Sequence, residues 1–541
     1  MPELSYRRRQ FVLGICCLSL LIVSLDSTVL NVALPSIRRD LHAEVSGLQW
    51  TIDAYTLVLA SLLMLSGSTA DRIGRRRTFQ AGLLLFTLAS LLCSLAPSLP
   101  WLIGFRALQA VGGSMLNPVA MSIITNTFTE PRERARAIGA WGAMMGLSMA
   151  AGPVAGGLLV ETTGWRAIFW MNVPVGIIAL VLAARFIPES RAPKPRRADP
   201  FGQLLMIVFL ASLTFGIIES PSKGWTSPLI LGCGVLALVA LAAFLAYELR
   251  REEPLIDPRF FRSVPFAGAT AIAVCAFAAL GGFLFLTTLY LQDVRGMSAL
   301  HAGLFMLPMA LMTLVCPPLS GRMVGRRGPR IPLIVAGVAM AAGAVLLATT
   351  ATSHTPVALL LTAFLIFGLG FGTVNAPITN TAVSGMPRTQ AGVASAVAST
   401  SRQVGQSLGV AVIGAVVAAA AASGTPLSNA QGTGGDRIAW WIVAGCGAAV
   451  LILGILTSGR WAHGTAVRTA ARLQHEDEAV TGAGGMAGTG TDGASASGDT
   501  TGTHGGTGTH GANATSSTSN THGRSGTTGN SGTTGNAVTA P

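Results

Sequence analysis

Charged side chains interrupt several long apolar stretches of this chain. Asp26 follows the apolar run 11–25, Asp53 and Arg106 lie near the starts of two later runs, and Arg402 lies deep in a fourth. An ionised side chain at the centre of a bilayer costs about 3 kcal/mol on insertion scales, so a chain that retains one there is expected to use it. The two acids could take up protons, and Arg106 could modulate them, because a nearby arginine favours a charged carboxylate whereas burial disfavours it.

Each of these residues also has a structural interpretation. Asp26 could lie at a helix end and reach the headgroups, Asp53 could cap an interfacial helix, and Arg106 could tether neighbouring helices. Arg402 is compatible with substrate contact and with a structural role alike.

The composition predicts an all-α integral membrane protein that positions these residues. Of 541 residues, 50% are apolar and 11% are charged, against about 25% charged in soluble domains. Fourteen apolar segments reach the spanning length of about 20 residues. They lie near 11–33, 48–68, 79–96, 100–124, 135–160, 165–187, 201–219, 227–247, 265–291, 299–320, 331–351, 357–384, 391–422 and 438–459.

The basic residues predict the orientation of these spans. A cytoplasmic N-terminus places 28 of the 36 Lys and Arg residues in cytoplasmic segments and six outside. This is the positive-inside pattern, and an even number of spans returns the C-terminus to the cytoplasm. Asp26, Asp53 and Arg106 then lie at similar depth in the outer half of the membrane, where they could meet. Tyr55 is expected in the membrane-interface region.

Several classes of function receive no support. The seven cysteines lie in apolar spans without the spacing of metal ligands, so no metal site is expected. Neither lysine lies in a phosphate-binding glycine loop, so we expect no nucleotide cofactor, and the energy must come from a partner or from an ion gradient. The net charge of +13 reflects short basic loops, which favours contact with lipid headgroups over nucleic acid.

An internal repeat divides the chain into related halves. The loop that begins at Gly67 recurs at Gly321, an offset of 321 − 67 = 254, and Asn117 recurs at Asn375 with an offset of 258. Parallel repeats of this kind place a substrate site between two bundles near the membrane midplane. The predicted parts are a six-helix bundle at 1–190, two inserted helices with linkers at 191–262, a second six-helix bundle at 263–478, and a disordered Gly/Thr/Ser-rich tail at 479–541.

Between about residues 10 and 460 the chain resembles the major facilitator superfamily, in particular its fourteen-span drug:proton antiporter branch. The motifs that carry the resemblance are Leu25–Pro35, the loop from Gly67 to Arg77, Arg106–Gln109, Gly152–Gly157 and Trp165–Pro174. The chain departs from the family pattern in two places. Ala110 replaces the usual glycine after Gln109, and Gly325 stands in the second-half loop where the first has Asp71.

The resemblance assigns roles to two groups of residues. The loop residues Gly67, Asp71, Arg72, Gly74, Arg75 and Arg76 are expected to gate the movement of the halves through charge-assisted hydrogen bonds, although a basic loop could also serve topology alone. The antiporter helix residues are Gly152, Pro153, Gly156 and Gly157. Gly152 and Gly156 lie on one helix face and allow close helix approach, which is equally consistent with plain packing.

The remaining polar residues of the spans are candidates for a substrate cavity. They are Asn31, Gln109, Asn117, Asn375 and Arg402. Hydrogen bonding between helices is the alternative role for the amides, because membrane helices use such groups to associate.

Together these observations predict a proton-coupled antiporter that exports small hydrophobic or cationic drugs across a bacterial plasma membrane. It is expected to be a multi-pass monomer with both termini in the cytoplasm and no enzymatic activity. Two alternatives remain open: an exporter dedicated to one endogenous metabolite or lipid, and a non-transporting membrane sensor or scaffold.

Overall fold

The computed structural model describes residues 5–191, 199–251, 254–384, 391–422, 435–459 and 461–472, and the predicted tail at 479–541 lies outside them. The helices of the first part are α1 (Tyr6–Asp40), α2 (Val45–Ile73), α3 (Arg75–Ser94), α4 (Leu99–Thr127), α5 (Pro131–Thr162), α6 (Ala167–Trp170), α7 (Asn172–Phe186), α8 (Pro200–Lys223) and α9 (Pro228–Glu248). Those of the second part are η1 (Pro258–Arg262), α10 (Val264–Leu289), η2 (Tyr290–Val294), α11 (Ala299–Phe305), α12 (Leu307–Arg327), α13 (Arg330–Thr350), α14 (Val357–Val383), α15 (Ala391–Ala422) and α16 (Gly435–Thr457).

Fourteen of the described helical segments are long and apolar enough to cross a membrane, which confirms the predicted number of spans. Two spans are each interrupted by one non-helical residue. Met171 separates α6 from α7, and Met306 separates α11 from α12. The described part of the chain contains no strand. The all-α membrane fold that the composition predicts is therefore the observed one.

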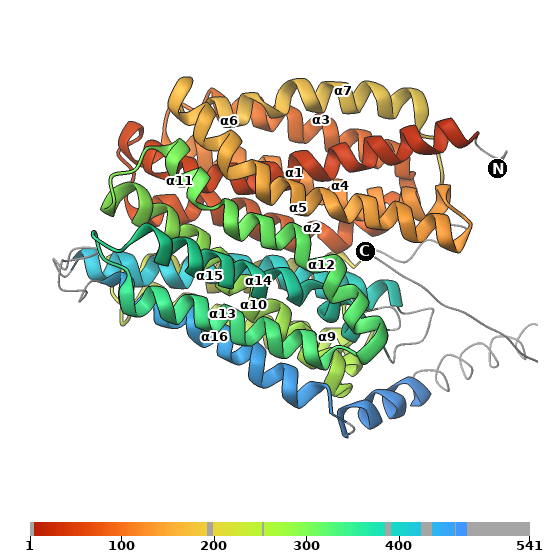
Figure 1. Cartoon of the computed structure of the whole chain (residues 1–541). Coiled ribbons are helices and arrows are strands. Elements are labelled where there is room, and N and C mark those ends of the chain that lie inside the picture. The colour runs from red at the N-terminus through yellow and green to blue at the C-terminus, as the bar shows by residue number, and fades with distance from the viewer. Residues whose placement is uncertain are drawn as a thin grey trace, which may run out of the picture. The chain divides into compact units, whose positions relative to one another are not determined.

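The two halves repeat the same pattern of helix packing. In the first half α1 packs on α5, α2 on α4, and α3 on α7; in the second half α10 packs on α15, α12 on α14, and α13 on α16. Figure 1 shows the two groups, with α1 to α7 in red to yellow and α10 to α16 in green to blue. Each half thus forms one six-span bundle, as the repeat in the sequence predicts.

The two additional spans, α8 and α9, form a hairpin beside the bundles. α8 packs against both α2 and α15, so it contacts each half. The Trp50 indole nitrogen donates a 2.9 Å hydrogen bond to Glu219 of α8, and the Gln203 amide of α8 donates to the carbonyl oxygen of Ser61. The inserted hairpin is therefore attached to the first half by polar contacts along α2.

The halves contact each other at the end of the bundles that is predicted to face outward. Arg38 of α1 pairs with Asp293 of η2 at 3.2 Å, and Ser298, which precedes α11, donates a 2.9 Å hydrogen bond to Glu161 of α5. Gln49 of α2 is buried and donates to the carbonyl oxygen of Ala411 in α15 at 2.8 Å. Backbone and side chains of both halves thus hold this end together.

Candidate functional site

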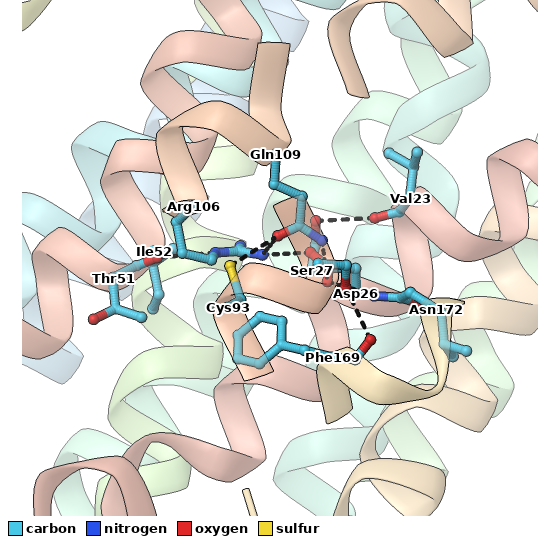
Figure 2. A network of polar contacts seen from close by, with 12 residues as sticks. Val23, Asp26, Ser27, Thr51, Ile52, Cys93, Arg106, Gln109, Phe169 and Asn172 are labelled. Atoms are coloured by element: carbon cyan, nitrogen blue, oxygen red, sulfur yellow. Dashed lines mark hydrogen bonds and ion pairs between the residues drawn. The ribbon is translucent and has the colours of Figure 1, made fainter. Parts of the chain in front are cut away.

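Asp26 is the centre of a buried hydrogen-bond network inside the first bundle (Figure 2). Arg106 Nη1 of α4 donates to Asp26 Oδ2 at 2.5 Å, and the two side chains are each 1% exposed. Asp26 Oδ1 accepts two further hydrogen bonds, from Gln109 Nε2 at 2.9 Å and from Asn172 Nδ2 of α7 at 2.8 Å. Three donors on two helices therefore compensate the carboxylate for its removal from water.

Arg106 is held from several directions. Its Nε donates to the carbonyl oxygen of Thr51 in α2 at 3.3 Å, and its Nη1 also donates to Gln109 Oε1 at 2.8 Å. The guanidinium lies 4.2 Å from the centre of the Tyr55 ring, a distance suited to a cation–π interaction. Because α1, α2, α4 and α7 all contribute to the network, a change of charge at Asp26 would act on four helices of one bundle.

Tyr55 therefore does not belong to the membrane interface, where the sequence places it. Its side chain is 1% exposed and supports Arg106. The polar face of α2 that appears interfacial in the sequence is covered by α4, so the tyrosine is buried at membrane depth.

Asp53 does not join the network, contrary to the expectation that three charges at one depth could meet. Asp53 is fully buried, with 0% of its surface exposed. The Thr56 hydroxyl donates a 3.2 Å hydrogen bond to Asp53 Oδ1, and the Ser407 hydroxyl of α15 lies beside the carboxylate. Among the residues that the structure describes, no basic side chain pairs with Asp53. Asp53 and Tyr55 are two residues apart on α2, and a step of two residues turns the side-chain direction by about 200° around the helix axis. Asp53 therefore points away from the side of α2 on which Tyr55 contacts Arg106.

Polar contacts join the ends of α2 and α3 in the loop from Gly67 to Arg77. Arg75 pairs with Asp71 at 2.9 Å, and the backbone nitrogen of Arg76 donates to Glu189 Oε1 at 3.1 Å. Gly74 adopts a φ of 124°, which L side chains rarely adopt, and a Cβ there would also meet the Glu189 carboxylate. These contacts all lie within the first half, at the end predicted to be cytoplasmic.

Gly74→Ala is expected to lower both stability and transport. The substitution forces an unfavourable φ, which costs about 1–3 kcal/mol, and displaces Glu189 from Arg76. Gly164→Ala is the matched control, because Gly164 has a φ of 97° but nothing within 4 Å of an added Cβ. Thermal unfolding in detergent and transport in vesicles measure the two effects. Equal losses in both variants would contradict a specific role for the contacts around Gly74.

The glycines of the antiporter helix lie against two different partners. A Cβ on Gly156 would lie 2.8 Å from Val29 Cγ1 of α1, and one on Gly152 would collide with Thr28. On another side of α5, Gly157 packs directly on the backbone of Ala299 in α11. α5 therefore joins α1 of its own half to α11 of the other half through close backbone contacts.

The second half contains an equivalent pair of glycines that the sequence analysis missed. Gly405 and Gly409 of α15 pack on the backbone of Val274 and Ala278 in α10. Their offsets from Gly152 and Gly156 are both 253, close to the 254 between the two loops. The shared four-residue spacing is the signal that could have revealed them.

The candidate cavity residues lie in different environments. Gln109 belongs to the Asp26 network, whereas Asn31 donates to the carbonyl oxygen of Ser27 at 2.9 Å and lines a small pocket between the halves. Asn117 and Asn375 are half-buried. Arg402 Nη2 of α15 donates to Thr379 Oγ1 of α14 at 2.5 Å. The structure therefore does not bring these five residues together in one cavity.

Asn172 belongs to the Asp26 network, although sequence reasoning did not single it out. It donates to Asp26 and also to Ser90 Oγ of α3 at 3.1 Å, and Ser90 in turn donates to the Phe169 carbonyl oxygen at 2.9 Å. Asn172 lies within the motif Trp165–Pro174, so its motif membership was the available signal.

Comparisons with known proteins agree with this architecture. The chain is 38% identical over 402 residues to the multidrug resistance protein Stp of Mycobacterium tuberculosis, covering 74% of each chain. It is 38% identical to the tetracenomycin C resistance and export protein of Streptomyces glaucescens, again over 74% of each, and 38% identical to a puromycin resistance protein of Streptomyces alboniger, over 79% of this chain and 86% of the relative.

Solved structures share the fold at lower identity. A POT family transporter in complex with 5-aminolevulinic acid matches with a TM-score of 0.61 at 14% identity, covering 82% of this chain and 96% of the other. A bacterial homologue of the human lysosomal transporter Spinster matches with a TM-score of 0.56 at 18% identity, covering 87% and 99%.

The family model of the Major Facilitator Superfamily matches residues 16–410, which include the Asp26 network, the Asp71 loop and the glycines of α5. With fourteen candidate spans, repeated bundles and relatives named as drug resistance proteins, this chain belongs to the major facilitator superfamily and is a multi-pass membrane transporter rather than an enzyme.

Proposed function

We propose that this transporter is a proton-coupled antiporter that exports small, largely apolar organic compounds, antibiotics among them. The observation that carries the proposal is the buried contact between Asp26 and Arg106 in a chain whose relatives are drug resistance proteins. Asp26 is the proton carrier, because binding of a proton removes its charge and weakens the hydrogen bonds that it accepts from Arg106, Gln109 and Asn172.

Asp53 provides a second proton site at the boundary between the halves. A buried carboxylate without a basic partner is costly, and binding a proton removes that cost. Asp53 lies four residues from Gln49, which is hydrogen-bonded to α15, so both residues point to the same neighbouring helix. Proton release from Asp53 would therefore oppose the contact between α2 and α15 and favour separation of the halves at this end.

The proposed topology places both termini in the cytoplasm of a bacterium. The excess of basic residues in the loops at one end supports it, since positive residues are retained on the cytoplasmic side. The end at which Arg38 pairs with Asp293 then faces outward, and the transporter acts as a monomer driven by the proton gradient without a bound cofactor.

Everted membrane vesicles from a strain without its own drug pumps test the proposal. A proton gradient is formed first, and antibiotics from a broad panel are then added while the gradient is followed with a pH-sensitive dye. We expect several compounds to dissipate the gradient in vesicles that contain the wild-type protein and none to do so in vesicles from the empty strain. A response to a single metabolite would favour a dedicated exporter, and no response across the panel would contradict export coupled to protons.

A further inference from the structure

Arg402 differs from Arg106 in having no acidic partner among the residues that the structure describes. Its Nη2 hydrogen bond to Thr379 Oγ1 uses one of the five N–H donors of a guanidinium. Its Nε is buried without a hydrogen-bond partner in the part of the chain that the structure describes, and none of the ion pairs found there involves Arg402. Phe277 of α10 lies beneath it, with the ring centre 6.0 Å from the guanidinium carbon. The second bundle therefore holds a cation with unused donors at membrane depth.

Thr379, the partner of Arg402, lines a cavity of about 600 Å³ between α12 and α14. This volume lies within the range of about 300–1,000 Å³ that is typical of sites for drug-sized ligands. Asn380 and Ser384 supply further polar groups to the wall, and Val324 and Val383 supply apolar surface. The cavity thus combines a surface for an apolar body with polar groups on one helix, and Arg402 reaches its wall through the hydrogen bond to Thr379.

Asp26 and Asp53, the two acidic residues that the sequence analysis singles out in the spans, do not place a negative charge at this cavity to balance Arg402. Asp26 already accepts hydrogen bonds from Arg106, Gln109 and Asn172 in the other bundle, and Asp53 is buried beside Ser407. No acidic side chain is among the described residues that line the cavity. Arg402 therefore adds a positive charge beside this cavity, which attracts anions and repels cations.

We propose that Arg402 and Thr379 form a subsite for an anionic oxygen group, a carboxylate or an ionised phenol, on the exported compound. The guanidinium matches such a group because it can donate two parallel hydrogen bonds to it, and the hydrogen bond to Thr379 holds the guanidinium at the cavity wall. The apolar wall then takes the hydrocarbon part of the molecule. This proposal rests on the proposed export function and names the substrate class as apolar organic acids, in place of the cationic drugs that the sequence suggests.

Binding of three probes with the same ring system tests the charge preference. The probes are 1-naphthoate, its neutral amide and 1-naphthylmethylammonium, measured by calorimetry on the purified full-length protein in lipid nanodiscs. We expect the wild type to bind the carboxylate at least about tenfold more tightly than the amide, and the ammonium ion most weakly. Equal binding of the carboxylate and the amide, or tighter binding of the ammonium ion, would overturn the subsite.

Variants test whether Arg402 and Thr379 cause the preference for the carboxylate probe over the neutral amide. Arg402→Gln is expected to abolish it, Arg402→Lys to retain part of it as a point charge, and Thr379→Val to reduce it because the guanidinium loses its anchor. Arg330→Gln, which removes an exposed arginine at the start of α13, is the control and should leave it unchanged. An unchanged preference in Arg402→Gln contradicts the proposal. If that variant does not fold, an unchanged preference in both Arg402→Lys and Thr379→Val contradicts it instead.

The vesicle assay separates this proposal from the proposed function. If neutral or cationic compounds dissipate the proton gradient while the carboxylate probe has no binding advantage, the exporter stands and the anion subsite is wrong. If the carboxylate is preferred in nanodiscs but no compound affects the gradient, the subsite stands and proton-coupled export is wrong.

Discussion

Replacement of Asp26 by asparagine is expected to reduce proton-coupled export to the background level of vesicles without the protein. Asparagine has nearly the shape of aspartate but neither carries a proton nor balances the charge of Arg106. Removing one partner of a buried ion pair costs about 3–5 kcal/mol, because the remaining charge is left uncompensated. Arg106 is 1% exposed, so the loss of its partner is expected to have this full effect.

The double variant Asp26→Asn/Arg106→Gln separates proton coupling from stability. It removes both buried charges, so its thermal unfolding temperature in detergent should exceed that of Asp26→Asn alone. Transport should remain absent in both, because neither retains the carboxylate. Asp293→Asn, which removes an acid that pairs with Arg38 outside the network, is a control that should keep coupling to the proton gradient.

Two results would argue against Asp26 as the proton carrier. Wild-type transport in Asp26→Asn would show that the carboxylate is dispensable. Recovery of transport in the double variant would show that the charge pair only holds helices together. In either case Asp53, which is buried without a basic partner among the described residues, would become the principal candidate.

Gly156→Val is expected to abolish transport through a different cause, the loss of close helix packing. The added Cβ would lie 2.8 Å from Val29 Cγ1 and 3.1 Å from the Val29 carbonyl oxygen of α1, which is too close for normal contact. Helices α1 and α5 would have to separate, and overpacking of this kind costs about 1–3 kcal/mol. The shift would also disturb α11, because α5 packs on it through Gly157.

Gly142→Val is the matched control on the same helix. It makes the same change in side-chain volume and helix propensity, but an added Cβ at Gly142 meets nothing within 4 Å. Transport in vesicles, normalised to the amount of folded protein, should be lost in Gly156→Val and retained in Gly142→Val. Gly409→Val on α15 should behave like Gly156→Val, since its Cβ would collide with the Ala278 backbone. Equal activity of all three variants would rule out the packing role.

Much of the fold could be predicted because membrane insertion depends on properties that the sequence displays directly. Each span needs a long apolar segment, and in a bilayer the backbone of such a segment must satisfy its own hydrogen bonds as a helix. The repeat of the Gly67 loop at Gly321 similarly predicted two related bundles, and the recurring helix pairs confirm them. The glycine pair at Gly405 and Gly409 was present in the same repeat, with the same four-residue spacing as Gly152 and Gly156.

The candidate site could be predicted only in part. The depth of a residue in the membrane follows from its position along a helix, which the sequence displays. From depth alone, Asp26 and Arg106 were predicted to be able to meet, and the structure shows their ion pair. The direction of a side chain around the helix axis depends on how neighbouring helices are rotated and packed, which residue spacing does not specify. For this reason Asp53 was expected in the same group, whereas the structure places it toward α15.

The sequence by itself thus determined the fourteen spans, the two bundles and the charged residues that a transporter of this kind must accommodate, because each follows from local hydrophobicity or from repetition along the chain. Only the tertiary structure decided which charges are compensated. It surrounds Asp26 with donors from α4 and α7 and leaves Arg402 without an acidic partner among the described residues, because compensation requires contact between helices that are distant in sequence.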